Sequence, residues 1–225
     1  DEAVVASNFI KKNKINFYEG IAYRTHDQTK VIKKILDQKE IGEIISIDSS
    51  FGFEVKRIKP GSRLFSKKLG GGSILDIGCY PFSFLNLLFN DNNDYKISNA
   101  RGGFTSTGVD NHAEAEIIIN DTINCSIQVS IKDNLENKIK IKGSNGEIIV
   151  NNPWLPDKKS TLDIKSGSSF HKKFINSQLN IYANQIQKIS DNFEKKINND
   201  RFAVDISDSL KIMKNLSLWS NLIKQ

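Results

Sequence analysis

Three consecutive glycines at positions 70–72 constrain the local fold of this chain more than any other feature. Glycine costs roughly 0.5–1 kcal/mol relative to alanine inside a helix or strand, so this run predicts a backbone that passes close to another group. Ser73 follows the glycines as a predicted helix N-cap. The next apolar residues recur at helical spacing and predict a mostly buried helix: Ile74, Leu75, Ile77, Phe82, Leu85 and Leu88.

Two polar side chains lie in the first turns of this predicted helix. Asp76 and Tyr80 are four residues apart, so we expect them on one face near the positive end of the helix dipole. One interpretation is structural, with Asp76 capping backbone amides and Tyr80 as a core aromatic whose hydroxyl is satisfied. The other is that the carboxylate and the phenol belong to a functional site.

The stretch resembles the Gly-Gly-Gly-x-x-x-Asp-x-Gly-x-Tyr segment of the glucose-fructose oxidoreductase, inositol dehydrogenase and MocA (Gfo/Idh/MocA) family of nicotinamide-dependent oxidoreductases. The likeness is nearest to the dihydrodiol and xylose dehydrogenase branch. It extends to residues 19–26, 41–44 and 152–154, and so covers nearly the whole chain. The resemblance implies that Tyr80 is the proton donor or acceptor of the reaction. Asp76 would orient it or anchor the glycine turn.

The resemblance also implies a substrate side formed by Arg24, His26 and Trp154. Arg24 and His26 follow a predicted strand, at a strand-to-helix junction where binding residues gather in open α/β sheets. The structural alternatives are that Arg24 pairs with a local carboxylate and that His26 caps the next helix. For Trp154, which lies between two prolines in a rigid turn, a purely structural role is the alternative.

Three residues are expected near the cofactor: Arg63, Gly71 and Gly72. A solvated basic loop would also account for Arg63. In the family, a glycine-rich phosphate loop and a Glu-Lys-Pro tripeptide with a catalytic lysine precede this region, and this sequence contains neither. We therefore expect NAD or NADP in the complete protein and no cofactor on this chain alone.

Periodicity predicts the remaining elements. Helices are expected at 1–13, 28–38, 181–193 and 206–222, strands at 15–19, 43–54, 96–104, 112–119, 123–131, 138–142, 147–150 and 162–164, and loops at 55–69 and 165–170. Short turns make neighbouring strands antiparallel. The expected fold class is α+β, a large open and mostly antiparallel sheet with helices on one face. The resemblance implies that residues 1–20 end a truncated dinucleotide-binding (Rossmann) domain and that residues 21–225 form a substrate-binding and oligomerisation domain.

The second face of this sheet needs a partner. Along its strands, one set of alternate residues is apolar and the other is polar. The apolar set includes Ile117, Ile119, Ile127, Val129 and Ile131, and the polar set includes Glu114, Glu116, Gln128 and Lys132. This mixture is too apolar for a fully solvated surface, so we expect a homodimer through the sheet, or a dimer of dimers. His112, Glu114 and Glu116 alternate along one strand, but this spacing alone does not define ligand geometry, and no metal is expected.

Composition excludes other classes of protein. The 32 Lys and Arg residues outnumber the 26 Asp and Glu residues and give a net charge of +6, but they form no long basic run with interleaved aromatics. We therefore expect no nucleic-acid partner. No apolar run approaches 18 residues, so no membrane span is expected. Cys79 and Cys125 lie in apolar segments and predict reduced thiols in the cytoplasm.

The sequence thus predicts the C-terminal catalytic and oligomerisation part of an NAD(P)-dependent oxidoreductase that transfers hydride to or from a sugar, polyol or related secondary alcohol. Tyr80 would exchange the proton, and its phenol, with an ordinary pKa near 10, needs a nearby cation to ionise at neutral pH. The chain lacks an initiator methionine, so we expect an inactive fragment. The alternative is a non-catalytic protein that uses the sheet for dimerisation or ligand binding.

Overall fold

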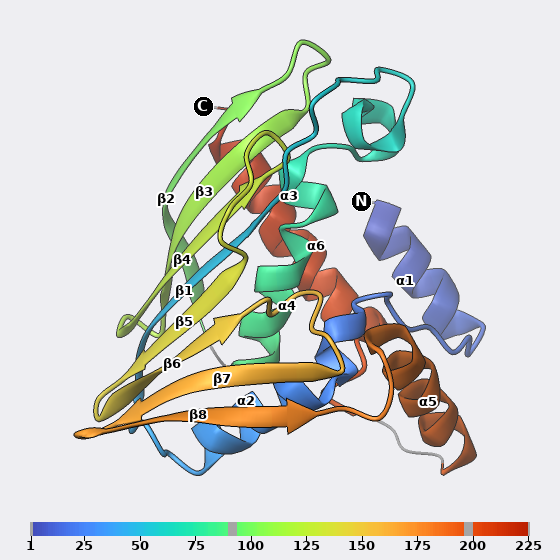
Figure 1. Cartoon of the computed structure of the whole chain (residues 1–225). Coiled ribbons are helices and arrows are strands. Elements are labelled where there is room, and N and C mark those ends of the chain that lie inside the picture. The colour runs from blue at the N-terminus through green and yellow to red at the C-terminus, as the bar shows by residue number, and fades with distance from the viewer. Residues whose placement is uncertain (1, 90–93, 196–199, 225) are drawn as a thin grey trace.

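One open sheet of eight strands and a layer of helices on one of its faces make up the fold (Figure 1). The computed structural model describes residues 2–89, 94–195 and 200–224. The strands are β1 (Ile44–Gly52), β2 (Tyr95–Phe104), β3 (Asp110–Ile119), β4 (Ile123–Ser130), β5 (Lys138–Gly143), β6 (Gly146–Asn151), β7 (Lys159–Ser166) and β8 (Ser169–Asn176). The helices are α1 (Glu2–Lys12), α2 (Asp27–Asp37), α3 (Ser73–Asp76), α4 (Cys79–Leu88), α5 (Ile181–Glu194) and α6 (Ile206–Leu222), with short 3-10 helices η1 (Ala22–Thr25), η2 (Arg63–Phe65) and η3 (Lys67–Leu69).

The order of strands across the sheet is β2-β3-β4-β1-β5-β6-β7-β8. Strand β1 lies in the middle, parallel to β4 and antiparallel to β5, and every other neighbouring pair is antiparallel. Tight turns connect the hairpins, as at Asn120 and Asp121, whose φ angles of 51° and 56° match a two-residue hairpin turn. The predicted α+β class with a mostly antiparallel sheet is confirmed.

Two predicted segments differ from the structure. Residues 15–19 do not form a strand, because only Tyr18 pairs, in an isolated bridge to Asp205. The predicted loop at 165–170 is a tight turn at Gly167, with φ of 57°, between β7 and β8. Strand β8 lies at the edge of the sheet, and Ile175 is its only buried residue, so it lacks the alternation that marks the inner strands.

The predicted helix at 74–88 is two helices, α3 and α4, which are separated at Ile77 and Gly78. A Cβ atom on Gly78 would lie 2.4 Å from the Ile74 carbonyl oxygen and 3.1 Å from the Trp219 ring. Trp219, on α6, is fully buried, and its Nε1 donates to the Glu114 carbonyl oxygen on β3 at 3.0 Å. The break therefore lets α6 approach α3 and reach the sheet.

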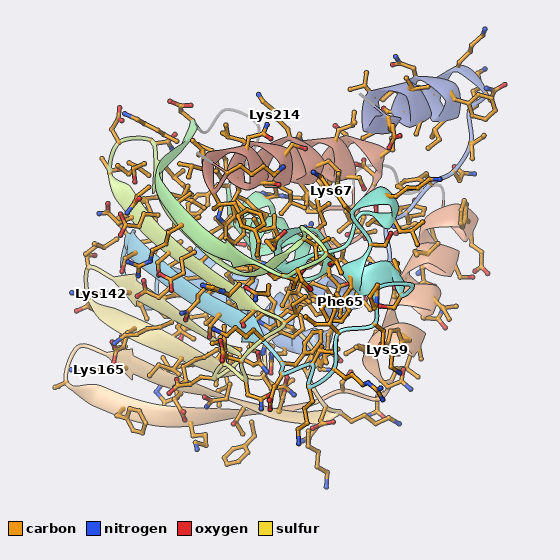
Figure 2. The ribbon with its side chains drawn as sticks, turned by 90° about the horizontal axis from the view of Figure 1, so that it is seen from above. Lys59, Phe65, Lys67, Lys142, Lys165 and Lys214 are labelled. Carbon is orange, nitrogen blue, oxygen red and sulfur yellow. The ribbon has the colours of Figure 1, made fainter. Side chains whose placement is uncertain are left out.

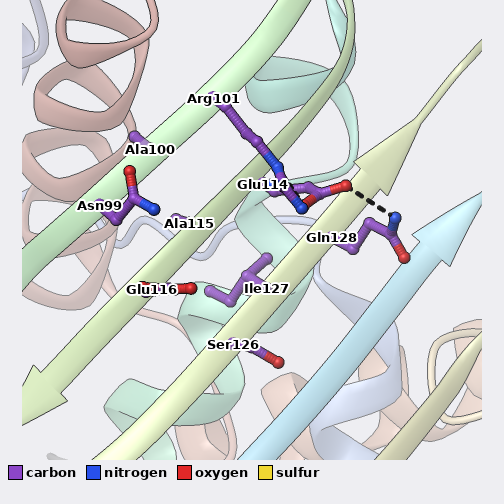
Figure 3. A pocket seen from close by; sticks show the side chains of 9 residues that line it. All are labelled: Asn99, Ala100, Arg101, Glu114, Ala115, Glu116, Ser126, Ile127 and Gln128. Carbon is purple, nitrogen blue, oxygen red and sulfur yellow. Dashed lines mark hydrogen bonds and ion pairs between the residues drawn. The ribbon is translucent and has the colours of Figure 1, made fainter.

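On every inner strand, the set of alternate residues that is apolar faces the helices. Its buried side chains include Ile47, Phe51, Ala115, Ile117, Ile127, Val129, Ile139, Ile141, Ile148, Val150, Leu162 and Ile164. The open face is consequently mostly polar, except at β8, where Phe170 and Phe174 lie on it and are 70% and 74% exposed. A hollow of about 260 Å³ on it is lined by side chains such as Asn99, Arg101, Glu114, Glu116, Ser126 and Gln128, and Gln128 donates to Glu114 (Figure 3). This face is more polar than we expected from the sequence.

The surface charge is dispersed around the molecule. Lys59 and Lys67 lie on one side and Lys142 and Lys165 on the opposite side (Figure 2). Among the described helices, none combines the length and the apolar character that crossing a bilayer requires.

Candidate functional site

The glycine segment packs against the chain itself. A Cβ atom on Gly71 would lie 2.4 Å from the Leu64 carbonyl oxygen and 2.6 Å from that of Arg63. Gly72 has φ of 109°, and a Cβ atom there would lie 2.3 Å from Asp110 Oδ1. The predicted close approach is therefore present, but the groups approached are residues 63–64 and Asp110. The cofactor contact predicted for Gly71 and Gly72 gains no support from this packing.

Asp110, at the start of β3, caps the N-terminus of α3. Its buried carboxylate accepts hydrogen bonds from the Ser73 hydroxyl at 2.6 Å and from the Ile74 backbone N–H at 2.7 Å. The N-cap residue of α3 is Gly72, so the prediction of Ser73 as N-cap is wrong. Sequence analysis missed Asp110, because no local pattern connects this strand residue to a helix that begins 37 residues earlier.

Gly72→Ala is expected to lower the free energy of unfolding by about 2–3 kcal/mol, because the new Cβ combines an unfavourable positive φ with a clash against Asp110. Urea denaturation of the variant and the parent chain measures the change. Gly61→Ala is the matched control, since nothing lies within 4 Å of its added Cβ. Equal loss in both variants would contradict this account of Gly72.

Asp76 holds the loop before the glycines. Its carboxylate forms an ion pair with the Arg63 guanidinium, and the hydrogen bond to Asp76 raises the pKa of Arg63. The Arg63 side chain is 62% exposed, whereas that of Asp76 is 15% exposed. The structure thus brings two predicted site residues together, and most of the Arg63 side-chain surface remains exposed to solvent.

Tyr80 lies just beyond the break between α3 and α4, and aromatic rings surround it. The centroid of its ring is 5.1 Å from that of Phe51, 5.9 Å from that of Tyr23 and 6.3 Å from that of Trp154. Tyr80 is half-buried, and among the described residues its phenol oxygen has no hydrogen-bond partner. Tyr23 comes from the predicted strand-to-helix junction that also carries Arg24 and His26, whereas sequence analysis had not connected Phe51 with this site.

Burial raises the pKa of Tyr80 to about 12, and Cys79, Tyr182 and Asp76 add to the rise. The phenol is therefore protonated at neutral pH and suited to donating a proton. To accept one, it needs a cation that lowers the pKa. None of the causes acting on Tyr80 within this chain lowers it.

Trp154 forms the inner wall behind Tyr80. The side chain is 0% exposed, and its Nε1 donates to the Ser50 carbonyl oxygen on β1 at 2.7 Å. Its ring stacks on Phe51 at 6.0 Å and meets Tyr23 edge-on at 5.3 Å. Trp154 therefore belongs to the candidate site. It would act on a bound molecule only indirectly, through the rings that it packs against.

Arg24 and His26 take structural positions behind the site. Arg24 is 1% exposed, and its guanidinium donates to the Ser83 carbonyl oxygen at 2.7 Å and to that of Arg201, and lies 3.4 Å from Asp208. His26 is buried and caps α2, where its Nδ1 accepts from the Gln28 backbone N–H at 3.1 Å. The capping role matches the structural alternative for His26, whereas the carboxylate near Arg24 is Asp208 on α6, which is not local in the sequence. Neither set of contacts supports direct substrate contact.

Comparison with known sequences gives one family for this chain. Residues 29–149 match the family model described as GFO/IDH/MocA C-terminal domain. A trans-1,2-dihydrobenzene-1,2-diol dehydrogenase of Xenopus tropicalis is 32% identical over 126 residues, which are 56% of this chain and 37% of that enzyme. The Mus musculus enzyme of the same name is 29% identical over 138 residues, 61% of this chain and 40% of that enzyme. The matched segments span less than half of these relatives.

Solved structures share the fold. KijD10, a 3-ketoreductase from Actinomadura kijaniata in complex with NADP and TDP-benzene, superposes with a TM-score of 0.84 at 18% identity, covering 98% of this chain and 66% of that one. An aldose-aldose oxidoreductase from Caulobacter crescentus complexed with glycerol gives a TM-score of 0.82 at 15% identity, covering 95% and 63%. At such identities the likeness shows the fold alone.

Proposed function

Because the chain belongs to the GFO/IDH/MocA family, we propose that it is the catalytic and oligomerisation part of an NAD(P)-dependent oxidoreductase. Its substrate would be a sugar, polyol or related secondary alcohol, and the reaction a hydride transfer. The trans-dihydrodiol dehydrogenases among its sequence relatives support a secondary-alcohol substrate. The observation that carries the proposal is Tyr80, whose ring is caged by three aromatic side chains while its hydroxyl has no partner among the described residues.

In this proposal, the chain contributes the proton transfer. A bound nicotinamide supplies the hydride chemistry. The Tyr80 phenol donates its proton to the substrate oxygen when a carbonyl is reduced, and takes the proton back when an alcohol is oxidised. The aromatic cage excludes water and fixes the ring, while the ion pair of Asp76 with Arg63 holds α3 against the loop.

The described residues fit a dinucleotide only in part. The space beside Gly71 and Gly72 is filled by the chain itself, and the sequence has no phosphate-binding glycine loop. Arg63, which is paired with Asp76 but whose side chain is 62% exposed, is the one predicted cofactor contact that is open to an anionic group. We therefore propose that the rest of the cofactor site lies in the complete protein outside these 225 residues.

The 225-residue chain alone is expected to bind NADH and NADPH only weakly, because the phosphate loop is missing from its sequence. Fluorescence titration with both dinucleotides measures the affinity, and the full-length protein is the positive control. Saturable binding at low micromolar concentration by this chain would refute the proposed division of the site.

The exposed apolar side of helix α1 supports the proposed domain boundary after residue 20. Val5 is 68% exposed and Phe9 is 62% exposed, and both line an apolar hollow of about 610 Å³. The helix lies at the periphery of the molecule and packs against α6 by its other side, where Ser7 is 1% exposed (Figure 2). Such an uncovered apolar side is typical of an interface. We propose that residues 1–20 belong with a dinucleotide-binding domain, which would cover it.

We also propose a homodimer through the open face of the sheet. One half of this face carries Asp48, Glu114 and Glu116, with Arg101 paired to Glu114, and has a small acidic excess. The other half carries Lys140, Lys142, Lys165 and Lys172, with Glu147 paired to Lys140 and Asp163 to Lys172, and has a basic excess. A two-fold axis lying in the interface, parallel to the strands and near β1 and β5, would place the acidic half of one copy against the basic half of the other.

Light scattering at low salt is expected to give twice the 25.4 kDa mass of one chain, and the dimer is expected to weaken as salt rises. The double change Lys140→Glu and Lys142→Glu should favour the monomer. Glu147→Lys, on neighbouring β6, is a control that changes charge in the opposite direction. A monomer at tens of micromolar at every salt concentration would contradict the dimer.

The decisive experiment for the function is an assay of the full-length protein with NAD and NADP against trans-dihydrodiols, aldoses and polyols. Turnover that depends on a nicotinamide cofactor is expected. Absence of both turnover and cofactor binding would favour the non-catalytic ligand-binding alternative. The free thiols of Cys79 and Cys125 agree with a cytoplasmic location, which is part of the proposal.

A further inference from the structure

We propose that Tyr23 is a positioning residue for Tyr80. Tyr23 lies on η1, outside the glycine and helix segments that carry the predicted catalytic residues, and its side chain is 1% exposed. The inference rests on the proposed catalytic role of Tyr80. It adds a residue that touches no substrate and acts by holding the phenol in place.

The first contact is with the backbone of Tyr80 itself. The Tyr23 hydroxyl lies 3.0 Å from the Tyr80 carbonyl oxygen and 2.7 Å from the Ser83 hydroxyl. Ser83 donates to the Tyr80 carbonyl oxygen, at 2.8 Å, and the single proton of the Tyr23 hydroxyl is then shared between that oxygen and Ser83. Two hydroxyl groups therefore converge on the peptide group that carries the proposed catalytic side chain, in the first turn of α4.

The second contact is with the ring. The rings of Tyr23 and Tyr80 stack at 5.9 Å with 23° between their planes, and Trp154 packs edge-on against Tyr23 at 5.3 Å. Tyr23 thus restrains both the backbone and the ring plane of Tyr80. Because a proton transfer requires the phenol oxygen at a fixed distance from the substrate oxygen, loss of this restraint should reduce turnover more than binding.

The hydroxyl of Tyr23 stays a donor throughout the working pH range. Burial raises its pKa further above the ordinary tyrosine value than Arg24 and the hydrogen bond with Ser83 lower it. Its bonds therefore persist under any condition in which Tyr80 exchanges a proton.

The chain offers a matched control in Tyr95, on β2. Its hydroxyl donates to the Leu85 carbonyl oxygen at 3.2 Å, so it also ties a tyrosine hydroxyl to the backbone of α4. That bond lies in the C-terminal half of the helix. Tyr23→Phe and Tyr95→Phe therefore each remove one hydroxyl from the support of the same helix, and only the first removes it beside Tyr80.

The test uses the full-length protein with its cofactor. Tyr23→Phe is expected to lower kcat about fivefold with little change in the KM of the alcohol, and to speed amide hydrogen exchange in residues 80–84 by a similar factor. Tyr95→Phe is expected to leave kcat unchanged. Melting temperatures of the two variants show whether both remain folded at the assay temperature.

Three outcomes decide the matter. A kcat loss in Tyr23→Phe but not in Tyr95→Phe, at constant KM, supports positioning. Equal kcat in both variants, while Tyr80→Phe is inactive, overturns the role of Tyr23 and leaves the proposed function intact. Full activity of Tyr80→Phe overturns the proposed function, and the positioning role with it.

Discussion

Tyr80→Phe in the full-length protein is expected to lower kcat about a hundredfold or more, with little change in cofactor affinity. General acid–base groups typically contribute factors of about 10²–10⁴, and the substitution removes only the hydroxyl. The ring that packs against Phe51, Tyr23 and Trp154 is retained, so the fold should be preserved. Steady-state kinetics in both directions, with cofactor binding measured separately, provide the test.

The pH dependence of the parent enzyme adds a second readout. Within this chain, burial raises the pKa of Tyr80 to about 12. The neutral phenol is the form that protonates a carbonyl, so reduction should proceed at neutral pH. Oxidation needs the phenolate, so its rate should rise with pH toward the pKa that the phenol has in the complete site. Tyr80→Phe should abolish this rise. An unchanged kcat in the variant would remove Tyr80 from the mechanism.

Arg24→Ala is expected to lower the free energy of unfolding by about 3–5 kcal/mol, because it removes one partner from a buried ion pair and the hydrogen bonds of the guanidinium to two carbonyl oxygens. The guanidinium connects the Ser83 carbonyl oxygen on α4 with the Arg201 carbonyl oxygen and with Asp208 on α6. Arg24→Lys should recover little stability, since a lysine lacks the planar fork that reaches all three. Urea denaturation measures both variants.

Arg57→Ala provides the comparison for this prediction, because Arg57 is exposed in the loop after β1. It should change stability by less than about 0.5 kcal/mol. A stable Arg24→Ala variant with weakened substrate affinity would restore the substrate contact implied by the family resemblance. The experiment therefore separates the two interpretations of this arginine.

The sheet could be predicted because its inner strands alternate strictly. Ile139 and Ile141 on β5, with Lys140 between them, and Ile148 and Val150 on β6, with Ile149 between them, point to the core. The helices at 28–38 and 206–222 were equally clear from their spacing. Strand β8 could not be predicted in this way. It is an edge strand that buries only Ile175, so its sequence lacks the alternation of apolar and polar residues.

The site could be predicted only in part, for a physical reason. Sequence pattern identified the segments that carry Asp76, Tyr80 and Trp154, but whether a polar residue binds a ligand or its own chain depends on contacts between distant segments. Asp110 meets the glycine turn from another strand, and this contact explains Gly72. Arg24 appeared suited to a substrate, and the structure shows its partners on α4 and α6 instead.

The central place of β1 has a consequence for the order in which the protein folds. Strands β2–β4 and β5–β8 form two series of neighbouring hairpins, whereas β1 pairs with β4 and β5, as in the contacts of Ser46 with Asn124 and Lys142. During synthesis β1 emerges before either partner exists, so its edge toward β4 stays open until residue 130 has been made and its edge toward β5 until residue 143. Closing such distant pairs is slow, and we infer that insertion of β1 between two preformed hairpin units limits the folding rate.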